Sequence, residues 1–176
     1  MNKFLIVVDM QNDFITGSLG TKEAQAIVSN VVNRINECKE NGYQIIGTLD
    51  THHENYFDTQ EGKKLPVKHC IAGTDGWLPP PEINNKFAGS PVFLKPTFGC
   101  VNLPGYIKET VDNLDGMTIE LIGVCTDICV ISNAILLKAY FPEATIQVNA
   151  ACCAGVTPEL HEAALKVMKS CQIDII

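Results

Sequence analysis

The sequence predicts an α/β fold: a single domain on a doubly wound, mostly parallel six-stranded sheet with helices on both faces. Two observations lead to it. Short apolar runs alternate along the chain with segments of helical periodicity, the order expected of strands joined by crossover helices. The apolar runs are continuous, as in strands that are buried on both faces. A length of 176 residues suits one domain, residues 1–176.

Each element has its own local signal. Strands are expected at residues 4–9, 44–49, 92–94, 118–122, 145–148 and 173–176, and helices at about 23–40, 103–114, 127–140 and 157–170. The first helix has apolar residues at helical spacing and ends at Asn41-Gly42. The last begins with Thr157 as N-cap and Pro158 at the first helical position. Residues 50–90 form a long irregular stretch, and so long a loop inside a domain is usually functional.

Composition narrows the function classes. The net charge of −7 argues against nucleic acid as a partner, because phosphate binding needs a basic surface. No apolar run approaches the roughly 20 residues of a membrane span, and the N-terminus lacks a signal-peptide pattern. The eight cysteines contain no CxxC pair, so reduced thiols are expected. We therefore expect a cytoplasmic protein that binds neither nucleic acid nor membrane.

The stretch Leu121–Val130 has the clearest chemical signal. An apolar run ends at Gly123, and Asp127 then begins a long helical run as its expected N-cap. This places the Cys129 thiol in the first turn of a helix, where the helix dipole lowers the pKa of a thiol and favours a nucleophilic thiolate. The alternative is an inert buried cysteine, which is a common role for this residue type.

Two other apolar runs also end in a charged residue. The first ends in Asp9 and another ends in Lys95. An aspartate that caps a turn and a solvated lysine are the ordinary alternatives. If the sheet is parallel, however, all three strand ends lie at one edge, and a thiol, a carboxylate base and a cation form a working set for acyl transfer.

The long loop is rich in residues that bind metals. Its candidate ligands are Asp50, His52, His53, Glu54, Asp58, Glu61 and His69. In an extended segment, Asp50 and His52 place both side chains on one side, as a chelate requires. Histidine and carboxylate are suitable zinc ligands. A solvated polar loop has a similar composition, so the loop alone does not decide between the two interpretations.

Together these segments resemble the isochorismatase-like cysteine hydrolase superfamily, whose best-known enzymes are nicotinamidases. The resemblance is carried by residues 7–14, 50–52, 95 and 123–130, in the family's order. It implies six strands in the order 3-2-1-4-5-6. It also implies a binding pocket where the strands ending near Asp9 and Cys129 lie side by side.

The resemblance also implies roles for individual residues. Asp9, Lys95 and Cys129 match the family's catalytic triad, and the backbone N–H groups of Cys125 and Cys129 would be the oxyanion donors. A cis peptide bond is implied between Val124 and Cys125.

The metal site implied by the resemblance consists of Asp50, His52 and His69, with Glu61 as a weaker or water-mediated fourth ligand. It would hold one divalent ion, zinc being favoured, with iron and manganese as alternatives; His53 and Asp58 are substitute ligands. The implied substrate is a small amide, nicotinamide first, and a homo-oligomer is left open.

One departure concerns the substrate ring. Nicotinamidases usually carry an aromatic residue that stacks on the pyridine just before a Pro-Pro-His segment, whereas this chain has Leu65-Pro-Val-Lys-His69. Phe14 remains as one ring-binding residue, and Trp77 is a candidate replacement for the other. The alternatives to a nicotinamidase are a metal-free relative, either an isochorismatase or a carbamoyl-amide hydrolase, and a non-catalytic binding protein on this fold.

Overall fold

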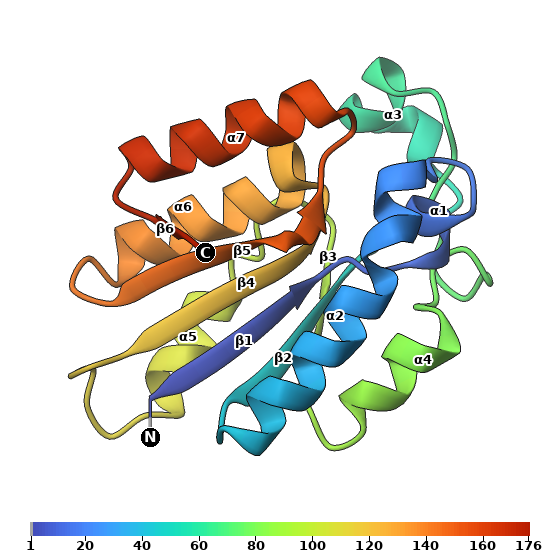
Figure 1. Ribbon diagram of the computed structural model, residues 1–176. Coiled ribbons are helices and arrows are strands. Elements are labelled where there is room, and N and C mark those ends of the chain that lie inside the picture. The colour runs from blue at the N-terminus through green and yellow to red at the C-terminus, as the bar shows by residue number, and fades with distance from the viewer. Residues whose placement is uncertain (1) are drawn as a thin grey trace.

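A six-stranded parallel sheet runs through the middle of the molecule in the computed structural model, which describes residues 2–176 (Figure 1). Its strands are β1 (Lys3–Val8), β2 (Gln44–Asp50), β3 (Val92–Lys95), β4 (Thr118–Val124), β5 (Thr145–Ala154) and β6 (Asp174–Ile175). Their order is β3-β2-β1-β4-β5-β6, and every pairing is parallel. This confirms the predicted fold class and the strand order that the resemblance implied.

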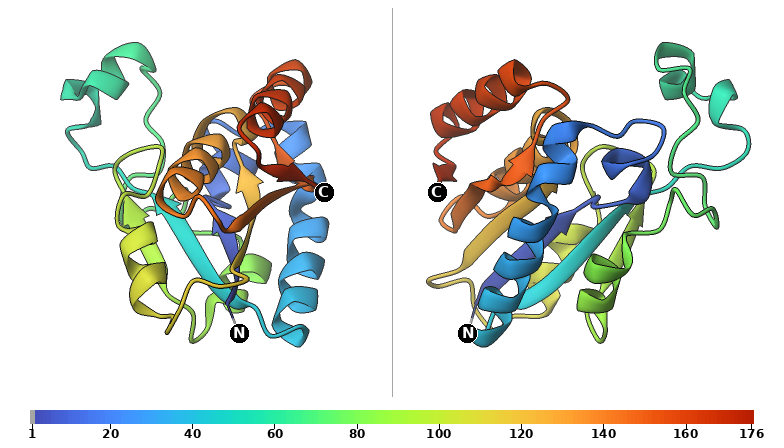
Figure 2. Two further views of the ribbon diagram at one scale, coloured as in Figure 1. Left: turned by 90° about the vertical axis from the view of Figure 1, so that its left-hand side faces the viewer. Right: turned by 45° about the vertical axis from the view of Figure 1, so that its right-hand side comes forward.

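Helices cover both faces of the sheet (Figures 1 and 2). They are α1 (Asn12–Ile15), α2 (Lys22–Glu40), α3 (Gln60–Lys64), α4 (Pro81–Asn84), α5 (Leu103–Glu109), α6 (Ile131–Tyr140) and α7 (Pro158–Ser170). Alternate residues of β1 face opposite cores, because side chains of a strand alternate. Leu5 and Val7 pack in the core that includes α2 and α4. Phe4, Ile6 and Val8 pack in the core that includes α5, α6 and α7.

Helices α2 and α7 each begin with a threonine cap, and Thr157 is the one that the sequence predicted. The Thr21 hydroxyl accepts a hydrogen bond from the N–H of Ala24 and begins α2. The Thr157 hydroxyl accepts from the N–H of Leu160 and begins α7, with Pro158 at the first position. Each cap satisfies an N–H group that the helix itself leaves without a partner.

Several element boundaries differ from the prediction. Strand β5 continues to Ala154, six residues beyond the predicted end, so Cys152 and Cys153 lie within it. Helix α5 ends at Glu109 rather than Leu114. The long loop contains short helical turns, among them α3 and α4. Strand β5 is longer than predicted because its second half, made mostly of alanine and cysteine, pairs with β4, which a local pattern does not reveal.

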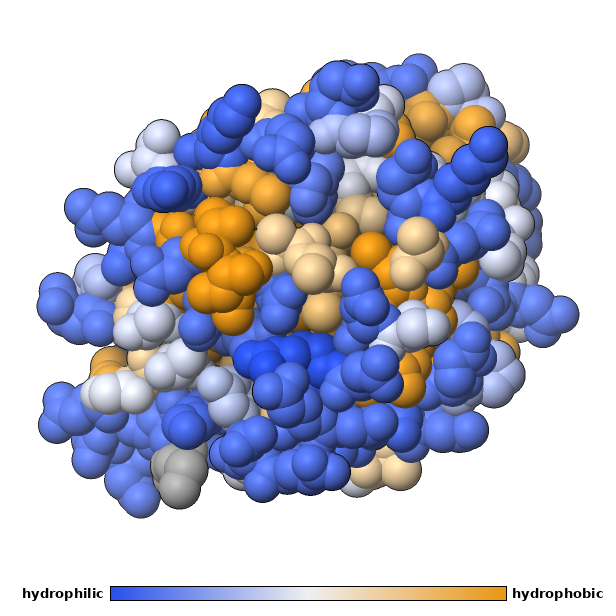
Figure 3. Space-filling model, in the orientation of Figure 1, coloured by the Kyte–Doolittle hydropathy of each residue, from blue (hydrophilic) through white to orange (hydrophobic). Residues whose placement is uncertain are grey.

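The surface is mostly hydrophilic on the face drawn in Figure 3, with apolar residues gathered in a few patches. Within residues 2–176, no helix combines the length and the apolar character needed to cross a membrane.

A buried ion pair joins α2 to the middle of the sheet. Glu120 on β4 has no exposed surface, and Arg34 contacts its two carboxylate oxygens through Nε at 2.7 Å and Nη2 at 2.5 Å. We expect Arg34→Met to lower the free energy of unfolding by about 3 kcal/mol, because it leaves a buried carboxylate without a counter-charge. Urea denaturation measures this loss.

The matched control is Glu37→Gln, which removes the other carboxylate in contact with Arg34, at 2.7 Å. Glu37 is exposed, so its loss should change the free energy of unfolding by less than about 0.5 kcal/mol. If the two variants lose the same free energy of unfolding, the Arg34–Glu120 pair contributes no more to stability than the exposed Arg34–Glu37 pair.

Candidate active site and metal centre

The carboxyl ends of β1, β3 and β4 bring three ionisable side chains together. Asp9 directly follows β1, Lys95 ends β3, and Cys129 lies in a helical turn that follows β4. The Lys95 Nζ lies 2.6 Å from the Asp9 Oδ2 and 3.4 Å from the Cys129 Sγ. Their exposed fractions are 0% for Asp9, 2% for Lys95 and 5% for Cys129. A buried ammonium group therefore contacts both the carboxylate and the thiol.

Asp9 is held by the neighbouring strand. Its backbone N–H donates to the Thr48 carbonyl at 3.1 Å, and the Thr48 hydroxyl donates to the Asp9 Oδ1 at 2.7 Å. The backbone of Asp9 has a φ of +49°, a left-handed conformation that aspartate tolerates better than most residues. Sequence reasoning missed Thr48, because only the strand order reveals which side chain lies beside Asp9.

Burial controls the protonation of this group. Burial raises the pKa of the Cys129 thiol well above its ordinary value, and Asp9 raises it further, while Lys95 opposes both. The expected lowering by the helix dipole is therefore wrong, because desolvation of the thiolate outweighs it. Burial also raises the pKa of Asp9, against the opposing charge of Lys95.

Lys95 behaves differently from its two neighbours. Burial alone would lower its pKa, but the charges of Asp9, Cys129 and Asp50 raise that pKa above its ordinary value. The lysine therefore stays an ammonium group. The resting site accordingly holds a neutral thiol next to a cation and a carboxyl group that can exchange a proton.

The turn that carries Cys129 differs from the predicted helix start. Residues Thr126–Val130 form a single π-helical turn before α6, with Cys125 at the N-cap position. The prediction of Asp127 as N-cap is wrong. The Asp127 carboxylate instead accepts a hydrogen bond at 2.9 Å from the N–H of Val156, two residues after β5 ends. The peptide bond between Val124 and Cys125 is cis.

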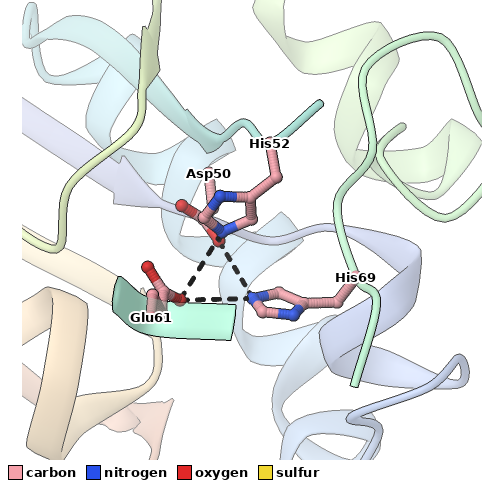
Figure 4. Close-up of side chains that lie close together, drawn as sticks. All are labelled: Asp50, His52, Glu61 and His69. Carbon is pink, nitrogen blue, oxygen red and sulfur yellow. Dashed lines mark ion pairs between the residues drawn. The ribbon is translucent and has the colours of Figure 1, made fainter. Parts of the chain in front are cut away.

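Four side chains, one from the end of β2 and three from the long loop that follows it, converge on one point (Figure 4). One ligand atom from each of Asp50, His52, Glu61 and His69 lies within 4.8 Å of the others. The Asp50 Oδ2 lies 3.0 Å from the His52 Nε2 and 3.4 Å from the His69 Nε2. The Glu61 Oε1 lies 3.6 Å and 3.7 Å from the same two nitrogens. The structure thus joins all four predicted ligands, whereas His53 and Asp58 lie outside the group.

This group has the chemistry of a divalent-metal site. Ligands about 2.0–2.1 Å from a tetrahedral zinc lie about 3.3 Å from one another, close to the observed spacings. The buried His52 Nε2 has no hydrogen-bond partner, although it points into the group. The His69 Nδ1 lies 2.9 Å from the Val67 carbonyl, which fixes the proton there and leaves Nε2 free to bind a metal. The residues therefore fit such an ion.

Two polar side chains after β1 support this group, and sequence reasoning missed both roles. The buried Gln11 side chain accepts from the N–H of Asp50 at 2.8 Å and donates to its carbonyl at 2.9 Å. The Asp13 Oδ2 accepts from the N–H of Cys70, next to His69, at 2.8 Å. The segment that begins with Asp9 therefore also fixes the backbone beside two of the candidate metal ligands.

The four candidate metal ligands and Cys129 line one cavity of about 860 Å³. Its lining includes Asp50, His52, Glu61, His69 and Cys129, and also Phe14, Leu65 and Phe98. Trp77 is not part of the lining, and its indole N–H donates to the Thr51 hydroxyl at 2.9 Å. Trp77 therefore does not replace the missing aromatic residue. The half-exposed Phe98, which follows β3, supplies an aromatic surface that sequence reasoning did not identify.

Solved structures with the same fold include several amidases. A pyrazinamidase/nicotinamidase from Streptococcus mutans is 29% identical, with a TM-score of 0.84, and the match covers 99% of each chain. A pyrazinamidase of Pyrococcus horikoshii in complex with zinc is 26% identical, with a TM-score of 0.81 and coverage of 100% of this chain and 99% of that one.

An N-carbamoylsarcosine amidase from Thermoplasma acidophilum is also 26% identical, with a TM-score of 0.78 and coverage of 99% and 95%. The isochorismatase domain model matches residues 3–176, which is nearly the whole chain. The chain's buried thiol, lysine and aspartate lie at one edge of a sheet with the strand order 3-2-1-4-5-6. The chain therefore belongs to the isochorismatase family.

Proposed function

We propose that this protein is a metal-dependent cysteine amidohydrolase that releases ammonia from a small aromatic amide, with nicotinamide as the first candidate substrate. The observation that carries the proposal is the contact of the buried Lys95 with both Asp9 and Cys129 beside a four-ligand group in one cavity. Similarity to nicotinamidases and pyrazinamidases supports it.

Catalysis begins with proton transfer from the Cys129 thiol to Asp9. The sulfur then attacks the amide carbonyl carbon, and a C–S bond forms as the carbonyl π electrons move to oxygen. The backbone N–H groups of Cys125 and Cys129 stabilise this oxyanion. Asp9 returns the proton to the nitrogen, the C–N bond breaks, and ammonia leaves. Water, deprotonated by Asp9, then hydrolyses the thioester to a carboxylate and restores the thiol.

Lys95 stabilises the charges that this cycle creates. Its ammonium group lies 3.4 Å from the sulfur that becomes a thiolate and 2.6 Å from the carboxylate that accepts the proton. Because the site is buried, these charges interact more strongly than they would in water. Lys95 thereby compensates the desolvation that keeps the resting thiol neutral.

Asp50, His52, His69 and Glu61 would hold one divalent ion, with zinc favoured by the two imidazoles and iron or manganese as alternatives. When bound, the ion would supply an open coordination position that orients a ring nitrogen of the substrate.

Asp9→Asn tests the general base. The variant keeps the shape of the side chain and can still accept from the Thr48 hydroxyl, but it cannot take up the thiol proton. We expect the acylation rate to fall by about 10²–10⁴-fold, measured as ammonia release across the pH range. Rates near wild type at every pH would exclude Asp9 as the base.

A substrate screen on metal-loaded protein tests the whole proposal. Ammonia release is measured with nicotinamide, pyrazinamide, benzamide and N-carbamoyl amino acids. Turnover of the ring amides alone supports the proposal. Turnover of the carbamoyl compounds alone would favour the alternative suggested by the carbamoylsarcosine amidase. If no compound is turned over, incubation with an aldehyde analogue and a mass-spectrometric search for a Cys129 adduct distinguishes an enzyme for another amide from a binding protein.

A further inference from the structure

Asn133 is a fully buried polar side chain in the first turn of α6, four residues after Cys129. Its Nδ2 donates to the Cys129 carbonyl at 2.8 Å and to the Phe98 carbonyl at 3.2 Å. Its Oδ1 accepts from the N–H of Cys100 at 2.8 Å. One amide group thus contacts the nucleophile's own backbone and two residues of the loop after Lys95.

Asn133 belongs to a helical segment that is otherwise largely apolar. Val130, Ala134 and Leu137 of the same helical segment belong to the hydrophobic core. Asparagine forms helices less readily than leucine or alanine, and burying an amide is unfavourable unless its hydrogen bonds are made. The three hydrogen bonds offset this cost, and they do so only while the segments that Asn133 joins keep their present arrangement.

The three hydrogen bonds join the turn that carries Cys129 to the loop that follows Lys95, and the proposed mechanism requires Cys129 and Lys95 to be in contact. Lys95 ends β3, and the loop Pro96–Asn102 then runs along the cavity to α5. Within residues 2–176, the hydrogen bonds that connect this loop to α6 and the turn before it all come from Asn133. Gly99 lies close enough to Ser132 that an added Cβ would contact its carbonyl oxygen at 3.5 Å, so the loop packs directly on the helix.

We infer that Asn133 is a positioning residue for the proposed amidase reaction: it ties the turn that carries Cys129 to the loop that follows Lys95, and so sets the contact between the thiol and the ammonium group. A satisfied buried polar network specifies one arrangement of its segments, because any shift leaves an amide group without partners. This inference rests on the proposed function for its effect on turnover, but the alignment can also be measured without substrate.

Two substitutions distinguish the hydrogen bond to the Cys129 carbonyl from the two hydrogen bonds to the loop. Asn133→Leu has a similar size and removes all three hydrogen bonds. Asn133→Thr keeps a hydroxyl that can bond to the carbonyl four residues earlier, that of Cys129, but is too short to reach the loop. Leu137→Ala is the matched control, because it removes a fully buried core side chain one turn later on α6 that makes none of these hydrogen bonds.

Three measurements are made on each folded variant. Hydrogen exchange at the Cys100 amide reports whether the tie is broken. The pH midpoint of Cys129 alkylation by iodoacetamide, located by mass spectrometry, reports the contact with Lys95. The kcat and KM values of ammonia release report alignment, since a displacement of about 1 Å can lower the rate by about 100-fold.

We expect both Asn133 variants to exchange the Cys100 amide faster, to raise the pH midpoint of Cys129 alkylation and to lower kcat by about 10- to 100-fold with little change in KM. Leu137→Ala should lower the thermal midpoint but leave the other quantities near wild type.

The inference is overturned if Asn133→Leu keeps the wild-type kcat and alkylation midpoint, if Asn133→Thr behaves as wild type, or if Leu137→Ala reproduces the same losses. If Asn133→Leu does not fold, Asn133→Thr decides alone. Wild-type protein that hydrolyses no amide would reject the proposed function, and the alkylation midpoint would still decide the role of Asn133.

Discussion

Replacing Cys129 with alanine is expected to lower ammonia release by about 10⁴-fold or more, because water at the same place cannot replace the sulfur nucleophile. The fold should remain, since the change removes one sulfur atom from a site that is 5% exposed. Ammonia release under saturating substrate gives the loss in turnover. Mass spectrometry of acid-quenched samples should find the thioester on the wild-type protein and not on the variant.

Cys125→Ala is the matched control. Cys125 lines the same cavity, and burial raises the pKa of its thiol to about 12, so it too is protonated at neutral pH. The mechanism uses only its backbone, and Cys125→Ala should retain much of the activity. If Cys125→Ala is inactive while Cys129→Ala turns over substrate, the nucleophile has been assigned to the wrong thiol.

The second large effect is expected for His52→Ala. The His52 Nε2 is a buried nitrogen without a hydrogen-bond partner and lies 3.0 Å from the Asp50 Oδ2. Removing it should weaken binding of the divalent ion by about 100-fold or more, since even an indirect supporting residue typically contributes 10–100-fold. Elemental analysis and a zinc-competition titration measure the loss. Ammonia release should fall with it, and restoring the metal after chelation should recover the wild type but not the variant.

His53→Ala is the control for this experiment, because His53 neighbours His52 in sequence but lies outside the four-residue group. It should bind the ion with wild-type stoichiometry. Wild-type protein that holds almost no metal and stays fully active after chelation would reject the metal site and favour the metal-free relatives.

The order of the elements could be predicted from sequence because it depends on local periodicity. The apolar run at residues 4–8 has the length and the β-branched content typical of a buried strand, and Thr157-Pro158 marks a helix start by local chemistry alone. The candidate reactive residues were found because each lies at or near a strand end. In a parallel sheet, such positions meet at one edge without any knowledge of side-chain packing.

The supporting contacts could not be predicted in the same way. The hydrogen bonds of Thr48 to Asp9, Gln11 to Asp50 and Asn133 to Cys100 join residues 33 to 39 positions apart. A polar residue in a buried element shows that it has a partner but does not identify it. The wrong direction for the Cys129 pKa has the same origin, since desolvation depends on what covers the thiol.

The segment from Asp9 to Phe14 contributes to both the candidate catalytic site and the candidate metal site. It contains the candidate base, the Gln11 amide that holds Asp50 and the Asp13 carboxylate that holds the residue after His69. Random mutagenesis should therefore find that substitutions in this segment abolish metal binding and turnover together. Such substitutions cannot change the substrate specificity while activity is retained. Directed evolution of a new specificity would instead succeed at the cavity rim, where the exposed residues Asn55, Gln60 and Lys64 can change without disturbing either centre.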